Sequence, residues 1–487
     1  MECATFPTRG FIIFPSKSLT TDNSLRICLN FAEKLVCPHK DRAAWYFGIT
    51  SPLASPITPS ISVTVCLAMH AADSISVDSS TQSSVLTVGS SIRRRRFSEH
   101  GATSKPAQPA RITSPNMANH LPITYRALQV DSVYTGLQIV EKPMLKADPG
   151  SAIVRIEAAK ILSYHLEVYN GERPYSFPTP IVGGGSAIGR IAAVGPDATA
   201  LTEGQLVYVD CVVHARDDPD AFFLSAVHDG GAPGSKKLMQ HVWRDGAFAE
   251  YAKFPFENCI VLNETVLCKE LGYSIEDLMY IGYLMVPFGG LRDIRLEPGE
   301  TIVVCPATGG YGGAGVQVAI AMGATVIAMG RNEEELARLK QHVLKGTPGA
   351  SIETVRITGD EAADLKSLQS FGVIDAVLDL TPPQASTSTH LRAATSALRR
   401  NGRVSLMGFV ERPVVPGLCV WRNITLKGKM MYERGDLVQM VKMLERGLFS
   451  RTGTFVETKS FGLDDWETAF DWAGKHTGIG RQVVLKP

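Results

Sequence analysis

The sequence predicts an α/β protein in which a β-rich domain precedes a doubly wound parallel sheet. Two observations support this fold class. From about 124 to 262 short strand patterns follow one another, whereas from about 263 to 431 strand patterns alternate with helical ones. Such alternation is typical of a parallel sheet covered by helices on both faces. The 487 residues, 45% of them hydrophobic and 20% charged, suffice for two or three globular domains.

The strand patterns differ between the two halves. In the first half Ala152 to Ala158 alternates as a half-buried strand does, and two further strands are closed by glycine turns. In the second half the strands are continuous apolar runs, as expected of strands that are buried on both faces. The expected strands are Gly189–Gly195, Gly204–Asp210, Gly372–Leu380, Gly402–Gly408, Asn423–Met431 and Gln482–Leu485, with a helix over Gly435–Gly447. The segment Gly246–Ala252 leads into another short strand. No internal repeat is found.

The most informative segment is Thr301–Arg331, which reads as strand, glycine turn, helix and strand. A buried strand at Ile302–Cys305 runs into small residues at the three positions of a dinucleotide-binding fingerprint, with Ala307 in place of the first glycine. Small residues permit the tight turn, a close approach of the pyrophosphate and close packing of helix on strand. The new helix N-terminus favours phosphate. The predicted binding turn comprises Ala307, Thr308, Gly309, Gly310, Tyr311 and Gly312.

The end of the second strand indicates which dinucleotide binds. An NAD-preferring unit places Asp or Glu there to accept hydrogen bonds from the ribose 2′-hydroxyl. This chain has Met329, Gly330, Arg331 and Asn332 instead. No carboxylate would repel a 2′-phosphate, and the guanidinium of Arg331 could bind one. The sequence therefore predicts NADP(H), although Arg331 could also be an ordinary solvated loop residue.

Charge and cysteine content exclude several classes of protein. The formal net charge of +1 gives no reason to expect nucleic acid or an acidic membrane as a partner. No stretch reaches the roughly 18 uninterrupted apolar residues of a membrane span. The nine cysteines are scattered and form no CxxC pair. This distribution favours reduced thiols, and we expect a cytoplasmic protein that acts on a small molecule.

Residues 1–116 differ in composition from the rest. They are rich in Ser, Thr and Pro, lack periodicity, and contain four consecutive arginines from Arg93 to Arg96. A transit peptide and a nuclear signal are two interpretations. We favour a third, a non-functional leader or an extension of the gene model, because Met117 begins a segment that resembles an ordinary protein start. The leader is expected to be mostly disordered.

Several motifs, in their order along 121–487, resemble the medium-chain dehydrogenase/reductase superfamily. They are Gly189–Gly195, Glu203–Val207, Gly246–Tyr251, the fingerprint Ala307–Gly312, and Gly402–Gly408. The resemblance implies a GroES-like catalytic domain over 121–262, a Rossmann NADP-binding domain over 263–431, and a return to the catalytic domain over 432–487. It also implies a substrate site between the two domains and a homodimer or a monomer.

The resemblance fails at the zinc-ligand positions of zinc alcohol dehydrogenases. The first ligand position holds Leu162, the Gly-His-Glu motif reads Gly184-Gly185-Ser186, and no cysteine lies near Gly282. Leucine and glycine cannot donate to a metal. The lobe that should carry four closely spaced cysteines has only Cys211. We therefore expect no metal, and the chain resembles the zinc-independent branch of quinone and enoyl reductases and of fungal polyketide enzymes.

The resemblance also places the candidate catalytic and cofactor residues. Tyr164 lies beside the lost ligand position, where the family has its proton-relay hydroxyl, and Ser163 or His165 could substitute for it or orient it. A histidine is the stronger acid near neutral pH, whereas Tyr164 could equally serve only for packing. Loops at the carboxyl ends of strands add Thr381, Gly408 and Phe409 as cofactor contacts.

The predicted function is NADPH-dependent reduction of an activated C=C or a ketone in a small, mostly apolar substrate. A polyketide or other secondary-metabolite intermediate is the substrate that the resemblance suggests. One alternative is an alcohol dehydrogenase or carbonyl reductase. The other, from a different class, is an NADPH-binding protein without catalysis.

Overall fold

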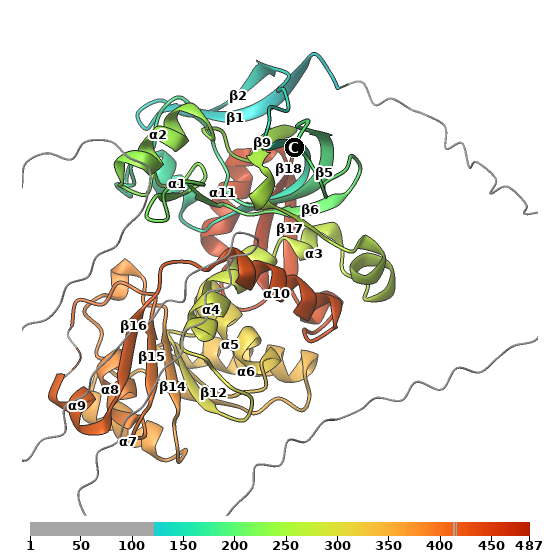
Figure 1. The fold of residues 1–487 in the computed structure, drawn as a ribbon. Coiled ribbons are helices and arrows are strands. Elements are labelled where there is room, and N and C mark those ends of the chain that lie inside the picture. The colour runs from blue at the N-terminus through green and yellow to red at the C-terminus, as the bar shows by residue number, and fades with distance from the viewer. Residues whose placement is uncertain (1–120, 413, 415) are drawn as a thin grey trace, which may run out of the picture. The chain divides into compact units, whose positions relative to one another are not determined.

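The computed structural model describes residues 121–412, 414 and 416–487. The leader predicted for 1–116 lies outside this part of the chain. The first strands form the β-rich part, which is drawn from cyan to green in Figure 1. Its strands are β1 (Thr124–Ser132), β2 (Gly136–Pro143), β3 (Ser151–Ile161), β4 (Ile181–Val182), β5 (Ala187–Val194), β6 (Leu206–Val209), β7 (Val212–His214), β8 (Phe222–Leu224), β9 (Tyr251–Pro255) and β10 (Cys259–Val261).

The main sheet of the β-rich part also receives the last two strands of the described chain. Its order is β10-β6-β5-β3-β18-β17, with β9 pairing β3 as well. β17 (Glu457–Gly462) and β18 (Arg481–Lys486) are parallel to each other, and β18 runs antiparallel to β3. Smaller sheets have the orders β2-β1-β4 and β7-β8. The segment after the second domain therefore returns to the first, although the predicted boundaries remain predictions.

The second half is a six-stranded parallel sheet with the order β13-β12-β11-β14-β15-β16. In Figure 1 its strands lie side by side from yellow to orange. They are β11 (Thr301–Cys305), β12 (Thr325–Gly330), β13 (Ile352–Arg356), β14 (Ala376–Asp379), β15 (Arg403–Leu406) and β16 (Thr425–Gly428). Within this sheet the first strand, β11, lies in the middle; β12 and β13 extend the sheet to one edge, and β14, β15 and β16 extend it to the other. The crevice rule for such sheets places ligands where this order reverses, at the carboxyl ends of β11 and β14.

Side chains that alternate along β11 separate two layers of helices. Ile302 and Val304 pack on the side of α4, α5 and α6, whereas Val303 and Cys305 pack on the side of α7 and α8. This arrangement confirms the predicted fold class, a β-rich GroES-like domain with a doubly wound parallel sheet. The helices are α1 (His165–Tyr169), α2 (Pro233–His241), α3 (Ile275–Leu278), α4 (Ile281–Asp293), α5 (Gly310–Ala321), α6 (Glu333–Gly346), α7 (Glu361–Gln369), α8 (His390–Ala397), α9 (Pro416–Arg422), α10 (Arg434–Glu445) and α11 (Trp466–Lys475). None of the described helices combines the length and the apolar content that a bilayer span requires.

Candidate functional site

The glycine turn joins β11 to α5. A Cβ on Gly312 would lie 2.0 Å from the carbonyl oxygen of Pro306, so only glycine lets the helix pack this closely on the turn. The backbone N–H of Ala307 donates to the carbonyl of Met329 at 2.7 Å and thereby ties the turn to β12. Gly309 precedes α5 without a side-chain cap, which leaves the first N–H groups of the helix for an anion.

The other residues of the predicted turn contact the end of β12 and helix α4. Thr308 packs against the end of β12, where its methyl group would lie 2.7 Å from a Cβ on Gly330. Gly310 lies against the ring of Tyr283, and the ring of Tyr311 lies 5.2 Å from the same ring. The turn therefore contacts α4, the helix that enters the Rossmann domain from the first domain.

Arg331 and Asn332 follow β12 and are exposed. Asn332 caps α6, because its side-chain oxygen accepts hydrogen bonds from the N–H groups of Glu334 and Glu335. Two of the three acids at the start of α6 are already paired, Glu333 with Arg356 and Glu335 with Arg338. Because these two carboxylates are paired with other arginines, they do not neutralise Arg331. The Arg331 guanidinium lies at the end of β12, where the 2′-position of a bound ribose is expected.

The loops after β14 and β15 lie against each other. The N–H of Phe409 donates to the carbonyl of Thr381 at 2.8 Å, and a Cβ on Gly408 would lie 2.2 Å from the Thr381 nitrogen. Phe409 itself is 61% exposed. Thr381, Gly408 and Phe409 are therefore brought together at one edge of the sheet, as their position after neighbouring strands predicts.

A buried polar cluster that the sequence reasoning missed lies under Thr381. The Thr381 hydroxyl donates to Asp379 and lies 2.9 Å from Nε2 of His390, whose Nδ1 lies 2.7 Å from the Ser388 hydroxyl. Ligand atoms of Cys305, Asp379 and His390 lie within 4.8 Å of one another, a grouping that occurs once among the described residues. Because hydrogen bonds within the chain already engage Asp379 and His390, we interpret the cluster as an internal support of the cofactor loops.

The three candidate proton donors occupy different environments. Ser163 is exposed, and Tyr164 is half-buried. His165 is buried among Tyr169, Phe248 and Phe470, and its Nδ1 accepts the N–H of Leu162 at 3.2 Å. Burial, and secondly the charge of Lys160, lowers the pKa of His165 to about 3. This environment suits a neutral histidine in an aromatic core.

Tyr164 is the candidate donor that meets the cofactor domain. Burial raises the pKa of its hydroxyl well above the usual value, and a hydrogen bond with the Tyr311 side chain works in the opposite direction. The guanidinium of Arg173 lies 4.3 Å from the centroid of the Tyr164 ring. Tyr164 thus brings the predicted donor position of the first domain onto α5, the helix of the glycine turn.

The positions of the expected zinc ligands are filled by other groups. Leu162 is 8% exposed and belongs to the core. A Cβ on Gly185 would lie 3.1 Å from Cβ of Cys211, and a Cβ on Gly282 would lie 2.8 Å from Nζ of Lys160. Side chains that could ligate a metal at these two glycines would therefore have to displace Cys211 and Lys160. The glycines at 183–185 are also closely packed, with Phe248 against Gly183 and Gly184. The residues present do not fit a zinc ion.

Lys160 is the main functional candidate that sequence reasoning missed. It is 5% exposed, and its ammonium group donates to the carbonyl of Gly282 at 2.7 Å. The same Nζ lies 4.6 Å from the Tyr283 ring centroid and 5.7 Å from that of Tyr311. Burial lowers the pKa of Lys160 to about 8, although negative charge on Cys211 and Asp210 works to raise it. A charged residue inside the apolar run 158–162 was the available signal.

Asp210 supplies the counter-charge of Lys160 and is itself held by long-range contacts. The Tyr432 hydroxyl donates to its carboxylate. Burial raises the pKa of Asp210 to about 6, against the hydrogen bonds from Tyr432 and from the backbone of Val212 and Cys211 and against the charge of Lys160. Above that pH the Asp210 carboxylate and the Lys160 ammonium form a buried pair of opposite charges.

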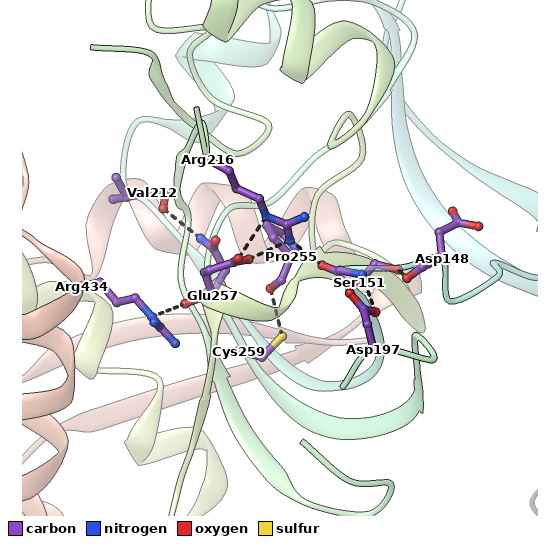
Figure 2. A network of polar contacts seen from close by, with 11 residues as sticks. Asp148, Ser151, Asp197, Val212, Arg216, Pro255, Glu257, Cys259 and Arg434 are labelled. Atoms are coloured by element: carbon purple, nitrogen blue, oxygen red, sulfur yellow. Dashed lines mark hydrogen bonds and ion pairs between the residues drawn. The ribbon is translucent and has the colours of Figure 1, made fainter. Parts of the chain in front are cut away.

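A second polar network fixes the chain on both sides of Asp210. The side-chain amide of Asn258 donates to the carbonyls of Asp210 and Val212 at 2.9 and 2.8 Å. Figure 2 shows the preceding residue, Glu257, in contact with Arg216 through its carboxylate and with Arg434 through its backbone carbonyl. Because Arg434 follows Tyr432 closely, this network holds the donor and the acceptor of the Tyr432–Asp210 hydrogen bond in place.

Two known domain families match two parts of the chain. Residues 148–264 match the alcohol dehydrogenase GroES-like domain, and residues 310–446 match the zinc-binding dehydrogenase domain. Both matches fall where the β-rich domain and the parallel sheet lie.

Similar proteins align with this chain over almost their whole length. The L-threonine 3-dehydrogenase of Ruegeria pomeroyi is 27% identical over 376 residues, which are 74% of this chain and 99% of that protein. The alcohol dehydrogenase of Geobacillus stearothermophilus is 26% identical over 368 residues, with the same shares. A crystal structure of a putative alcohol dehydrogenase from Sinorhizobium meliloti 1021 has a TM-score of 0.58 at 23% identity, and covers 75% of this chain and 98% of its own.

The similar proteins support a nicotinamide cofactor but do not distinguish NADP(H) from NAD(H). A zinc-type alcohol dehydrogenase-like protein of Schizosaccharomyces pombe, 23% identical over 358 residues that are 70% of this chain and 92% of that protein, is among the similar proteins, so zinc independence remains a prediction. Fold, order of domains and both family matches agree. The chain belongs to the medium-chain dehydrogenase/reductase superfamily of alcohol dehydrogenase-like oxidoreductases.

Proposed function

We propose that the protein is an NADP(H)-dependent carbonyl reductase or alcohol dehydrogenase that works without zinc. The observation that carries this proposal is the meeting of Tyr164 and Lys160 with Tyr311, the second residue of α5. It brings polar hydrogens of the first domain to the helix that begins at the glycine turn. A carbonyl oxygen beside a bound nicotinamide would find these groups within its surroundings. The names of the similar proteins favour this alternative over C=C reduction.

The preference for NADP(H) rests on Arg331. A guanidinium binds phosphate through charge-assisted hydrogen bonds, and the first acid after it, Glu333, is already paired with Arg356. When bound, the reduced cofactor supplies the hydride. The chain's own contribution is to position the two reactants and to stabilise the charge that develops on oxygen.

The substrate is proposed to be small and mostly apolar. The rings of Tyr164, Tyr283 and Tyr311 line the region where the two domains meet, and Tyr175 lies 6.5 Å from Tyr164 between ring centroids. Aromatic rings favour apolar surfaces and leave only a few polar groups to orient a substrate. We infer no particular metabolite from them.

Reduction of an activated C=C is the second candidate. The residues at the three lost ligand positions favour it, because Leu162, Gly185 and Gly282 offer no metal donor, as in the quinone and enoyl reductases that the sequence resembles. A polyketide intermediate would then be one possible substrate class. Hydride addition to an enone also places negative charge on an oxygen, so the same polar groups would serve.

Substrate panels separate these candidates. Purified protein is mixed with NADPH and, in parallel, with a saturated ketone, an aldehyde, an enone and a quinone, and the products are identified by mass spectrometry. We expect NADPH oxidation with formation of the alcohol, and NADP⁺ reduction by that alcohol in the reverse direction. Turnover of the C=C substrates alone would establish the second candidate. Saturable NADPH binding without turnover would instead indicate a non-catalytic binding protein.

Pairing of two copies through β16 remains a prediction from the family resemblance. All four residues of this edge strand, Thr425–Gly428, are exposed, and Trp421 before it is 81% exposed. An unpaired edge of this kind can add a strand from a second molecule. A monomeric mass in solution would contradict the homodimer.

A further inference from the structure

The ammonium group of Lys160 fills the space beside Gly282, one of the three lost ligand positions. A side chain at Gly282 would meet Nζ and Cε of Lys160, and a side chain at Gly185 would meet Cys211. The positive charge at this position therefore belongs to a side chain of the protein, Lys160. A zinc ion brought to the same place would be repelled by that charge and would find no ligand at Leu162.

Titratable groups face Lys160 from each element packed against it. Asp210 and Cys211 follow β6, Tyr283 belongs to α4, Tyr311 to α5 and His165 to α1. Tyr208 of β6, Tyr164 before α1 and Tyr432 after β16 complete the set of titratable groups in the cluster. Of these groups, only Asp210 is charged near neutral pH, since its pKa is about 6 while that of Cys211 is raised to about 11.

The ammonium group also has capacity for a ligand. An ammonium has three N–H donors, and one of them donates to the carbonyl of Gly282. The two neighbouring rings lie at 4.6 and 5.7 Å from Nζ, and Tyr311 and Tyr164 are only half-buried. A substrate oxygen that enters beside Tyr311 would therefore reach a preorganised cation next to the glycine turn.

We propose that Lys160 is a catalytic residue that replaces the metal of the zinc enzymes: its ammonium group binds the carbonyl oxygen of the substrate and protonates it. This inference rests on the proposed function. The Asp210 carboxylate, held by Tyr432, is a positioning residue that keeps Lys160 charged.

Hydride arrives at the carbonyl carbon, the π electrons of the C=O bond move to oxygen, and an O–H bond forms as one N–H bond of Lys160 breaks. The carbonyl is reduced and the nicotinamide is oxidised. Lys160 is left as a neutral amine and regains a proton from water. A pKa near 8 suits this role, because the group is largely charged at neutral pH and is a stronger acid than an ordinary lysine.

The test compares Lys160→Met with Lys253→Met. Methionine keeps most of the side-chain length without charge, and Lys253 is a surface lysine of the same domain that pairs with Asp148. For Lys160→Met we expect a loss of at least about 100-fold in kcat/KM for the carbonyl substrate, since general acids contribute about 10²–10⁴-fold. The Kd for NADPH should stay within about twofold. Lys253→Met should match the unsubstituted protein, and added ethylamine should partly rescue Lys160→Ala, whose short side chain leaves room for the amine.

Two measurements on the unsubstituted protein keep the inference testable if Lys160→Met fails to fold. The kcat/KM for reduction should fall as pH rises through about 8, because Lys160 loses the proton that it must donate. Elemental analysis after dialysis against zinc should find less than about 0.1 zinc per chain at this site, with Cys305→Ser reporting on metal held at the other cluster.

The outcomes separate the two proposals. Full activity of Lys160→Met, or stoichiometric zinc that Cys305→Ser does not remove, overturns the role of Lys160 while carbonyl reduction stands. An unsubstituted protein that reduces no carbonyl compound overturns both.

Discussion

The cofactor side and the substrate side of this protein are built in different ways. The cofactor side is local: the glycine turn, Tyr311 and Arg331 all lie within one βαβ segment, and backbone geometry does most of the positioning. The substrate side is assembled from distant segments. Lys160 meets Gly282, and Asp210 meets Tyr432, across sequence separations of 122 and 222 residues. A short motif can therefore indicate a cofactor site, whereas the group that we propose to act on the substrate emerges only from the fold.

The largest expected effect is a loss of NADPH affinity on the cofactor side. Gly312→Val places a side chain 2.0 Å from the Pro306 carbonyl, so the turn must open and NADPH affinity should fall more than about 100-fold. Fluorescence titration with NADPH measures it, with circular dichroism to check the fold. Gly349→Ala, in the loop after α6, is the control, because a Cβ there also meets nothing within 4 Å. Equal affinities of the two variants would contradict the assigned geometry.

A smaller change tests cofactor choice on the same side. Arg331→Asp removes the phosphate-binding cation and introduces the carboxylate that NAD-binding units use. A charged hydrogen bond contributes about 1.5–3 kcal/mol, so NADPH affinity should fall about 10- to 100-fold while NADH affinity rises. Lys340→Ala, which removes a paired cation further along helix α6, should leave the NADPH to NADH ratio unchanged. If Arg331→Asp also leaves it unchanged, Arg331 is only a solvated loop residue.

On the substrate side, Asp210→Asn tests the charge network without removing Lys160. The Asp210 carboxylate favours the protonated lysine, so its loss should lower the Lys160 pKa further. The alkaline fall in kcat/KM should then begin about one pH unit lower, which amounts to about tenfold well above pH 8. Asp148→Asn, at the surface, should keep the original profile. A uniform loss of activity with no displacement of the profile would indicate a structural role for Asp210.

Tyr164→Phe should have the smallest effect. If Lys160 gives the proton, the Tyr164 hydroxyl contributes one hydrogen bond to the substrate oxygen, and its removal should cost about 1 kcal/mol, or about fivefold in kcat/KM. Tyr175→Phe, whose ring packs edge-on against Tyr164, serves as the packing control. A loss of more than about 100-fold for Tyr164→Phe alone would restore Tyr164 as the proton donor.

Particular residues show where prediction from sequence succeeded and where it stopped. The small residues at 307, 309 and 312 forecast a tight turn because their constraints are local. The missing donor side chains at the zinc-ligand positions are also readable from known motifs, whereas zinc independence itself remains a prediction. His165 looked like a candidate acid because sequence does not reveal its aromatic neighbours. Lys160 was missed because a buried lysine becomes informative only when Asp210, Gly282 and Tyr311 surround it. Spacing alone could not have joined these residues.

The pairing of β18 with β3 bears on how the protein is made. Val484 is the register partner of Lys160, so the strand that carries the ammonium group is completed by a strand synthesised after the whole Rossmann domain. Domains generally fold in order as a chain leaves the ribosome. The nucleotide-binding sheet can therefore form on the nascent chain while Lys160 still lacks one neighbour. In this order the domain that carries Lys160 is completed last, after the cofactor domain has formed.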